Sequence, residues 1–429
     1  MSASHVLACG AVGLAIASTV VACAASNNES AAPAPSPDAS GTVLPDAESP
    51  ASDGGVDARE DVVVGDPGCS EAGWCLTTLP DEDLMLKDIW PFDGRAIALA
   101  ESPTLGIKVL EWQDAEGAWT YVDDGTQNQD GFGAYVGKGW APSDSEFYYP
   151  VAPGYVYHGT RTAAGWTWTR TPLPTNNLDI DSANPTYSMI NARYPAFGVW
   201  GTSASNLYAW YANTIYHWTQ DDAGERSWVS EYVAGDPSSP LERLFVLGAA
   251  GTSSDDVWFS GARSQMGAGC ALVIRRTAAG YQRIADGTIG GPYWPCFDRP
   301  GFLRIAGAEG WLTDIQAVSN DQFIALKGGR DVVRISATDS GYSVDRASIP
   351  ANVSPSALNS LWSDSGNLWL AGWGRVIRGS DVWSGGAFGI STIALGNGPI
   401  NRPIYQVRGT SNTNLWAIGV RYAFHKTTP

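Results

Sequence analysis

One short unit recurs along this chain, and it limits the folds that the chain can adopt. The segment from Phe197 to Thr219 reads as three strands, because apolar residues alternate along each part, with a Gly-Thr-Ser-x-x-Asn turn and an Asn213-Thr214 turn between them. A fourth strand follows at Trp228. A meander of this size cannot bury a core alone, so copies of it have to pack against one another.

Seven copies of the unit align between residues 69 and 429 in three shared columns. The first-strand column is filled by Trp90, Trp140, Trp200, Ala250, Val318, Trp362 and Arg408. The second-strand column is filled by Ile97, Tyr148, Tyr208, Trp258, Ile324, Trp369 and Trp416. The third-strand column is polar and is filled by Glu111, His158, His217, Arg275, Arg334, Arg378 and His425. Six or eight copies are the alternatives, because the fifth and sixth copies are irregular.

A Gly-Thr-Ser turn follows the first strand in three of the copies, at residues 201–203, 251–253 and 409–411. An amide or carboxylate residue stands just before the second strand, and these residues are Asn206, Asp256, Asn367 and Asn414. Short hydroxyl and amide side chains can bond the backbone of their own turn. We therefore expect these residues to build the turns rather than a site.

The last copy reaches Pro429 without a fourth strand, and an unassigned strand precedes the first copy. Residues Gly73 to Pro80 resemble the segments that end earlier copies. If Trp74 to Leu79 completes the last sheet, the ring closes without an open joint. The sequence thus predicts an all-β fold, a seven-bladed β-propeller over residues 69–429 that is closed by an N-terminal strand.

The first 68 residues have a different character. Residues 1–22 read as a signal peptide that ends before Cys23, and Val20-Val21-Ala22-Cys23 resembles a bacterial lipobox. An ordinary cleaved signal is the alternative, and the start lacks the usual Lys or Arg. Residues 23–68 carry nine acidic residues against Arg59 alone, which predicts a disordered tether. Because no Asp follows Cys23, we expect an outer-membrane lipoprotein facing the periplasm or the exterior.

The net charge of −18 argues against nucleic acid as a partner, because no basic stripe is present to displace phosphate counterions. The cysteines after Cys23 predict two local disulfides in an exported chain, Cys69–Cys75 and Cys270–Cys296. Zinc is not expected, because no cluster of His accompanies these cysteines.

No pattern of catalytic residues emerges from the sequence. The three His of the third-strand column share it with Arg and Glu, so we interpret them as structural polar positions. The nucleophile-elbow, P-loop and His-Glu-x-x-His motifs do not occur. The segment Asp364 to Trp369 resembles the Asp-box of sialidase-type propellers, which is itself a structural turn.

One stretch of the sequence partly matches a metal-binding loop. Residues 124–131 hint at a calcium loop, but Thr126 stands in the position of the first ligand and Gly137 in that of the closing Glu. We therefore expect no cofactor, with calcium as the alternative.

The Gly-Thr-Ser-x-x-Asp/Asn-Val/Leu-Trp repeats occur together with the lipobox, the Ser/Pro/Asp-rich tether and a Cys-Ser-x-x-Gly-Trp-Cys segment. In this combination the chain resembles a family of bacterial lipoproteins with tandem β-propeller repeats. The resemblance covers essentially the whole chain. It implies a fold and a cellular address, and no common activity.

Function is expected where the chain departs from its repeat. Two long insertions, Pro174 to Ala196 and Ala285 to Leu312, join a fourth strand to the next first strand. The second insertion carries Tyr293, Trp294 and Phe297, which either contact a partner or plug the propeller funnel. We expect a non-catalytic module that binds a protein or polysaccharide at the cell surface. A polysaccharide hydrolase or lyase and a structural subunit of an envelope assembly are the alternatives.

Overall fold

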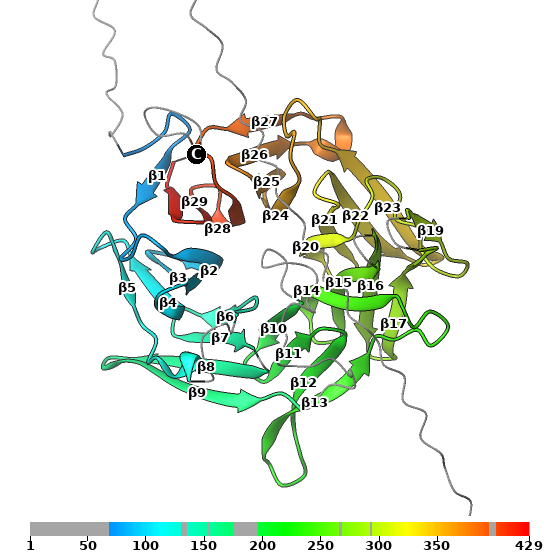
Figure 1. Ribbon diagram of the computed structural model, residues 1–429, viewed down its shortest axis with the longest axis horizontal. Helices are drawn as coiled ribbons and strands as arrows, with labels where there is room; N and C mark the ends of the chain where they lie inside the picture. The colour runs from blue at the N-terminus through cyan, green and yellow to red at the C-terminus, as the bar shows by residue number, and fades with distance from the viewer. Residues whose placement is uncertain are drawn as a thin grey trace, which may run out of the picture. The chain divides into compact units, whose positions relative to one another are not determined.

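A ring of small β-sheets makes up the described part of the protein (Figure 1). The structure is a computed structural model and describes residues 68–129, 135–152, 154–174, 196–265, 268–291, 294–393 and 400–428. Within these ranges, seven four-stranded antiparallel sheets follow one another around a central channel, and a two-stranded sheet is attached to the fourth. This is the predicted seven-bladed β-propeller.

The blades are numbered in chain order. Blade 1 has β2 (Met85–Phe92), β3 (Arg95–Ser102), β4 (Gly106–Gln113) and β5 (Ala118–Tyr121), and blade 2 has β6 (Trp140–Ser143), β7 (Glu146–Val151), β8 (Tyr155–Thr162) and β9 (Gly165–Pro172). Blade 3 has β10 (Phe197–Ser203), β11 (Asn206–Tyr211), β12 (Thr214–Gln220) and β13 (Arg226–Val233), and blade 4 has β14 (Arg243–Ser253), β15 (Asp256–Gln265), β16 (Ala268–Thr277) and β17 (Gly280–Ala285). The small sheet consists of β18 (Gly287–Ile289) and β19 (Cys296–Asp298).

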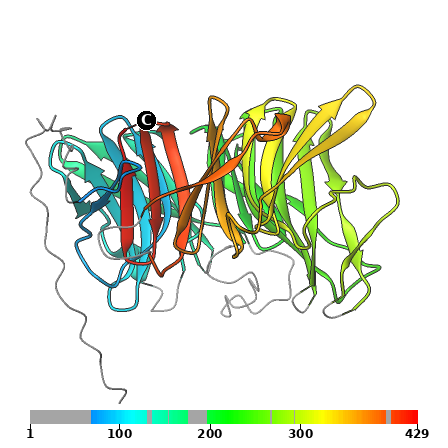
Figure 2. The same cartoon turned by 90° about the horizontal axis from the view of Figure 1, so that it is seen from above.

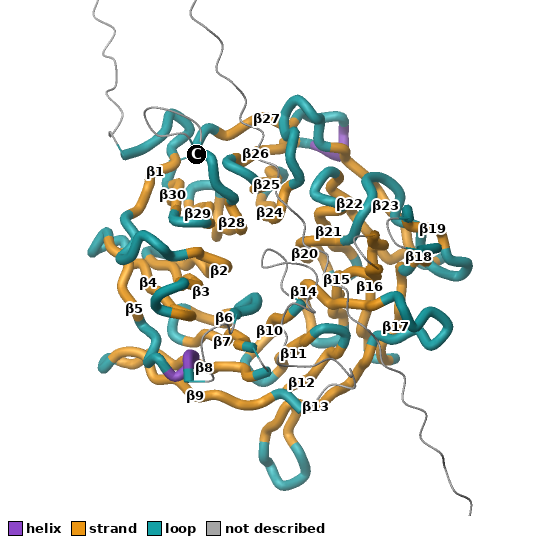
Figure 3. The backbone as a smooth tube through the Cα atoms, viewed as in Figure 1, coloured by secondary structure: helices purple, strands orange, loops and turns teal. Residues whose placement is uncertain are grey.

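The remaining blades complete the ring. Blade 5 has β20 (Leu312–Ser319), β21 (Gln322–Lys327), β22 (Asp331–Thr338) and β23 (Gly341–Ser348), and blade 6 has β24 (Leu358–Asp364), β25 (Asn367–Gly372), β26 (Arg375–Ser380) and β27 (Phe388–Ser391). Blade 7 has β28 (Ile404–Ser411), β29 (Asn414–Gly419), β30 (Tyr422–Lys426) and, as its outermost strand, β1 (Trp74–Thr77). Two short 3₁₀ helices, Thr126–Asn128 and Val382–Ser384, appear in purple in Figure 3. In the described ranges no helix could span a membrane.

The core lies between blades rather than inside any one of them. Middle strands such as β11 are buried on both faces, because neighbouring blades cover each face, whereas outer strands such as β9 alternate with solvent. Each main apolar cluster joins two blades; one, for example, packs Leu110 and Trp112 of blade 1 against Trp416 and Ile418 of blade 7. A single blade therefore has no core of its own, which explains why the unit has to recur.

The ring closes through β1, as the sequence predicts, although the strand ends at Thr77 rather than Leu79. Trp74 is fully buried, and its indole Nε1 donates a hydrogen bond to the Ser391 hydroxyl of blade 6 at 2.9 Å. On the other side, Trp119 of blade 1 donates to the Thr77 hydroxyl at 2.9 Å. The closing strand thus joins both neighbouring blades, and the predicted Cys69–Cys75 disulfide clamps its start.

The first-strand column seals joints between blades, and two of its Trp rings lie against the Gly of a Gly-Thr-Ser turn on the next blade. A Cβ added to Gly251 would lie 2.9 Å from the Trp200 ring of the preceding blade, and one added to Gly201 would lie 3.3 Å from the Trp140 ring. The Trp90 indole donates to the Gly139 carbonyl of blade 2 at 2.9 Å. Trp140 and Trp200 therefore reach across their joints to glycine. In all three turns a Cβ would also come within 2.8 Å of the carbonyl oxygen of the residue that begins the second strand, Asn206, Asp256 or Asn414.

The predicted alignment is wrong at one position of this column. In blade 5, Gln316 pairs with Ile324, and Val318 lies two residues further along, half exposed. Gln316 closes its joint through polar contacts, since its side chain donates to the Ser363 carbonyl at 2.9 Å and accepts from the Ser363 amide at 2.7 Å. The amide of Gln316 takes the place of Trp at this joint, so a pattern based on large apolar residues points to Val318 instead.

The two faces of the ring differ. We call the face with the connections between first and second strands the turn face, and the opposite face, with the second-to-third and fourth-to-first connections, the loop face. Because Trp74 pairs with Lys426, the start of β1 and the end of β30 lie together on the turn face. This face is the upper one in Figure 2, where the C-terminal end is marked.

Replacing the closing tryptophan tests the role of β1. We expect Trp74→Ala to lower the free energy of unfolding by about 3–5 kcal/mol, because it leaves a cavity between two blades and removes the bond to Ser391. Denaturant unfolding followed by fluorescence measures the loss. The matched control is Leu76→Ala on the same strand, where the side chain is 41% exposed and the expected loss is below about 1 kcal/mol. Equal losses for both variants would contradict a closing role for Trp74.

Candidate functional site

Blade 4 departs from the repeat by extending beyond the other blades on the loop face. Its strands β14, β15 and β16 have eleven, ten and ten residues, whereas β10, β11 and β12 of blade 3 have seven, six and seven. Pairing extends from the shared position, Ala250 with Trp258, out to Arg243 with Ser264, with one register shift between Val246 and Gly248. The extension forms a rigid β-structure to which loops can attach.

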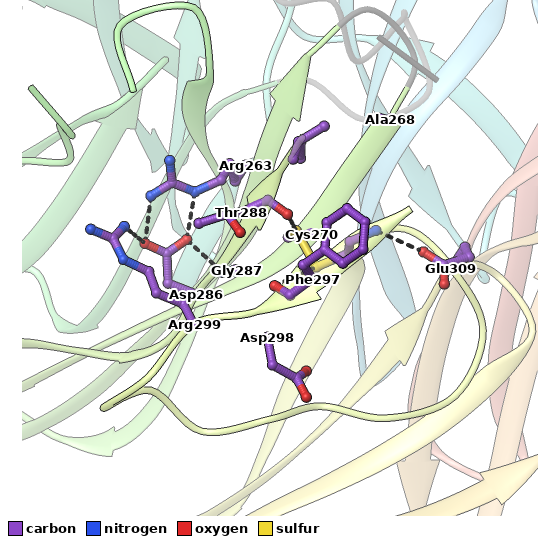
Figure 4. Close-up of a disulfide and its surroundings, with 12 residues drawn as sticks. Arg263, Ala268, Cys270, Asp286, Gly287, Thr288, Phe297, Asp298, Arg299 and Glu309 are labelled. Carbon is purple, nitrogen blue, oxygen red and sulfur yellow. Dashed lines mark hydrogen bonds and ion pairs between the residues drawn. A yellow bond between two sulfur atoms is a disulfide. The ribbon is translucent and has the colours of Figure 1, made fainter. Parts of the chain in front are cut away.

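The predicted disulfide fixes the second insertion to this extension. Cys270 of β16 is bonded to Cys296 of β19, and β18 pairs with β19 beside them (Figure 4). Gly287 lies against the bridge, and a Cβ there would come within 2.6 Å of both sulfur atoms. The bridge and the small sheet therefore hold the chain on either side of the predicted aromatic residues.

A buried ionic cluster lies next to the disulfide, and its centre is Arg263 of β15. The fully buried Arg263 guanidinium donates two hydrogen bonds to Asp286, at 2.8 and 2.7 Å (Figure 4). It also donates to Glu242 at 2.7 Å and to Asp236 at 2.9 Å, so one side chain joins two separate fourth-to-first connections. Arg299 bonds to Asp236 and Asp286 from the insertion itself.

The charges in this cluster balance. Arg283 contributes a third guanidinium and bonds to Asp286 at 2.9 Å, so three guanidinium groups face three carboxylates. Burial alone would raise the pKa of the Asp286 carboxyl, but Arg263 and Arg283 hold that pKa below its usual value. Because each charge is paired, this buried cluster can hold the two connections together without leaving an uncompensated charge.

The aromatic residues predicted to contact a partner lie on this ordered segment. The Trp294 side chain is 56% exposed and that of Phe297 is 43% exposed, with their ring centroids 6.4 Å apart. Neither ring is buried at these exposures. Tyr293, the third predicted residue, lies outside the described residues. The first insertion, Pro174 to Ala196, also lies largely outside them.

A cavity of about 550 Å³ adjoins Trp294 on the loop face. Its wall includes Pro295, Glu309 and Trp311, and Trp311 packs over Gly269 of β16, where a side chain would collide with the ring. Sequence reasoning missed Trp311. The signal that could have found it is Gly269 within a strand that is otherwise well filled, since an isolated strand glycine often marks a close approach.

Exposed apolar side chains gather on the loop face. Of the nine large apolar residues that are exposed in the described ranges, five lie on second-to-third or fourth-to-first connections, namely Leu105, Leu241, Trp294, Phe297 and Trp373. Three lie on the outer strands, and Val318 lies on the turn face. The loop face is therefore the more apolar of the two.

The predicted alignment of the third-strand column is confirmed, since every one of its seven residues pairs with the predicted second-strand residue. His158 stacks on Tyr148 with ring centroids 4.3 Å apart, and His425 stacks on Trp416 at 4.1 Å. Arg275 lies 4.5 Å from the Trp258 ring centre. Stacking on an aromatic ring is a role that both imidazole and guanidinium can fill.

The Asn side chains before the second strands make other hydrogen bonds than the sequence predicts. Asn206 donates to the Thr202 hydroxyl at 2.7 Å and accepts from His217 at 3.0 Å, instead of bonding the turn backbone. Asn414 repeats this pattern with Thr410 and His425. His217 and His425 of the third-strand column are the donors, so each Asn side chain links its turn to the third strand. Burial lowers the pKa of the His425 imidazole, which favours the neutral ring in this contact.

The residues that suggest a calcium loop, 124–131, do not form a set of calcium ligands in the described part of the chain. The Asp124 carboxylate accepts hydrogen bonds from the Thr126 amide and hydroxyl, at 3.0 and 2.7 Å, and so orders the start of the helix Thr126–Asn128. Asp130 and Gly131 lie outside the described residues. Within the ranges that the structure describes, no three His, Cys, Asp or Glu side chains are grouped to hold a metal ion.

Comparison with known proteins places the fold. No protein-family model matches this chain. No curated protein matches it either. Among solved structures it is similar to YCF48 from Cyanidioschyzon merolae, with a TM-score of 0.53 and 13% identity over 83% of this chain and 99% of that one. It is also similar to YCF48 bound to D1 peptide, with a TM-score of 0.53 and 12% identity over 83% and 96%. At such identities the likeness shows the β-propeller fold alone.

The ionic cluster can be tested by removing its central cation. We expect Arg263→Ala to lower the free energy of unfolding by about 3–5 kcal/mol, because three carboxylates would stay buried without their common partner. Arg304→Ala is the matched control, since Arg304 pairs with Asp298 at 3.2 Å on the surface, where such a pair contributes about 0–1 kcal/mol. Chemical denaturation measures both. A loss for Arg263→Ala no larger than that of the control would mean that the cluster does not stabilise the extension.

Proposed function

We propose that this chain is a cell-envelope lipoprotein whose propeller is a non-catalytic module that binds a protein through its loop face. The observation that carries the proposal is the exposure of Trp294 and Phe297 on a segment that a disulfide and a buried ionic cluster hold in place. Exposed aromatic side chains on rigid structure are typical of binding hot spots, because little conformational entropy is lost when a partner covers them.

The extent of the apolar surface favours a protein over a polysaccharide at this face. Leu105, Leu241 and Trp373 extend the apolar character across connections of blades 1, 4 and 6, well beyond the groove beside Trp294. A folded protein or a peptide can cover several such positions at once. The solved structure of YCF48 with D1 peptide is an example of a protein of this fold bound to a peptide.

Truncation of the exposed indole tests the binding site. We expect Trp294→Ala to weaken the affinity for the captured partner about thirty-fold or more, which corresponds to a hot-spot loss of about 2 kcal/mol. The partner is first isolated by affinity capture from an envelope extract, identified and purified. The dissociation constant is then measured by surface plasmon resonance with wild type and variant.

Ile390→Ala is the control for this test, because Ile390 is 53% exposed on the outer strand β27, away from the loop face. Its affinity should match that of wild type. Unchanged affinity for Trp294→Ala, or equal losses for both variants, would show that the proposed site is wrong.

The anchor is tested separately. We expect Cys23→Ser to move the protein from the membrane fraction to the soluble fraction and to abolish incorporation of a labelled fatty acid, because the thiol that carries the lipid is gone. Fractionation and metabolic labelling measure both effects. A variant that still sediments with the membrane would refute the lipid anchor and leave the binding site untouched.

A further inference from the structure

A second cavity lies at the opposite end of the propeller, where the central channel opens on the turn face. Its volume is about 440 Å³, within the range of about 300–1,000 Å³ that is usual for small-ligand sites. First strands line it, and partly exposed Trp90, Trp200 and Trp362 form three sides of its wall. The proposed binding of a protein on the loop face does not use this cavity.

The cavity exists because the repeat is broken on one side of the channel. Blade 4 has Ala250 in the first-strand column, where Trp stands in four other blades, and the neighbouring wall of blade 5 is Ala317. The aromatic seal that closes the joint between blades 3 and 4 is thus missing between blades 4 and 5, where the small side chains of Ala250 and Ala317 border the cavity.

The charged groups of this cavity are already paired. Lys138 binds Asp314 at 3.0 Å, and the second oxygen of Asp314 accepts from the Leu361 amide at 3.0 Å. Arg408 binds Asp88 at 3.3 Å and stacks on Trp90 at 4.3 Å. A ligand with a net charge would find no counter-charge here, and it would lose its hydration without compensation.

Polar groups that can bond a neutral ligand stand at the mouth. The Thr410 hydroxyl accepts from Asn414 at 2.9 Å and keeps its own hydrogen to donate. The Thr252 hydroxyl, which donates its hydrogen to Asn320, also lines the cavity and can accept a bond from a ligand. The partly exposed indoles of Trp200 and Trp362 combined with hydroxyl groups fit a molecule that has both apolar C–H faces and many hydroxyls.

We propose that this cavity is a binding site for a neutral saccharide. The C–H face of a pyranose ring packs against the indoles, and its hydroxyls bond to the Thr410 and Thr252 hydroxyls at the mouth. The site is independent of the loop face, so the protein has two binding functions on opposite sides. A charged sugar, a phosphate or a peptide does not match the balanced charge and the wall.

The test uses the full-length protein in a detergent without a sugar headgroup. Wild type is applied to an array of neutral and anionic glycans, and the dissociation constant for the best neutral oligosaccharide is measured by calorimetry. Ala250→Trp restores the side chain of the other blades and fills the cavity, and we expect it to weaken binding at least ten-fold. Ala250→Leu adds a smaller side chain and should weaken saccharide binding by an intermediate factor.

Two control variants show whether saccharide binding depends on this cavity. Val318→Trp adds the same bulk on the same face outside the cavity and should bind like wild type. Trp294→Ala, which tests the loop face, should also leave saccharide binding unchanged. If Ala250→Trp does not fold, a photoreactive form of the same saccharide is cross-linked to wild type, and we expect the label on peptides that contain residues 90–92 or 249–252.

Three outcomes would overturn the proposal. The first is an array on which no neutral glycan binds, or on which anionic glycans bind better. The second is saccharide binding that survives Ala250→Trp in a folded variant. The third is a photolabel that appears on the peptide of Trp294 instead of the turn-face peptides.

Discussion

Closure of the ring depends on the antiparallel pairing of β1 with β30. A propeller blade has no core of its own, so its stability comes from the two blades beside it, and one open joint would expose two apolar faces and two strand edges. Trp74 meets this demand because it is buried in the joint and bonds to blade 6, while Thr77 accepts a bond from blade 1. Everything on the two faces is held in position by this circular packing.

The residues of the first-strand column close the joints between blades through chemically different interactions. Trp140 and Trp200 reach across to glycines, Gln316 bonds the backbone of the next blade through its amide, and Arg408 stacks on Trp90. What these residues share is the ability to span one joint. Ala250 lacks that ability, so its joint leaves space in the channel.

Both candidate sites arise where the repeat is relaxed, and in each case the surrounding structure is rigid. On the loop face, Arg263 and the Cys270–Cys296 bridge hold the exposed Trp294 on a lengthened blade. On the turn face, the paired ions Lys138 and Asp314 hold the floor of the cavity. Stable scaffolds with local exceptions allow one fold to host different functions.

The blade number, the closing strand, both disulfides and the pairing of the third-strand column could be predicted from the amino-acid order alone, because they depend on spacing along the chain and on a period of two. The same reasoning assigned Val318 instead of Gln316 to the first-strand column, since spacing cannot tell which side chain spans a joint. The network of Arg263, the packing of Trp311 on Gly269 and the cavity beside Ala250 became visible only in the folded ring. These features join residues from separate loops or blades, and the distances between such residues are set by the ring and not by their separation in sequence.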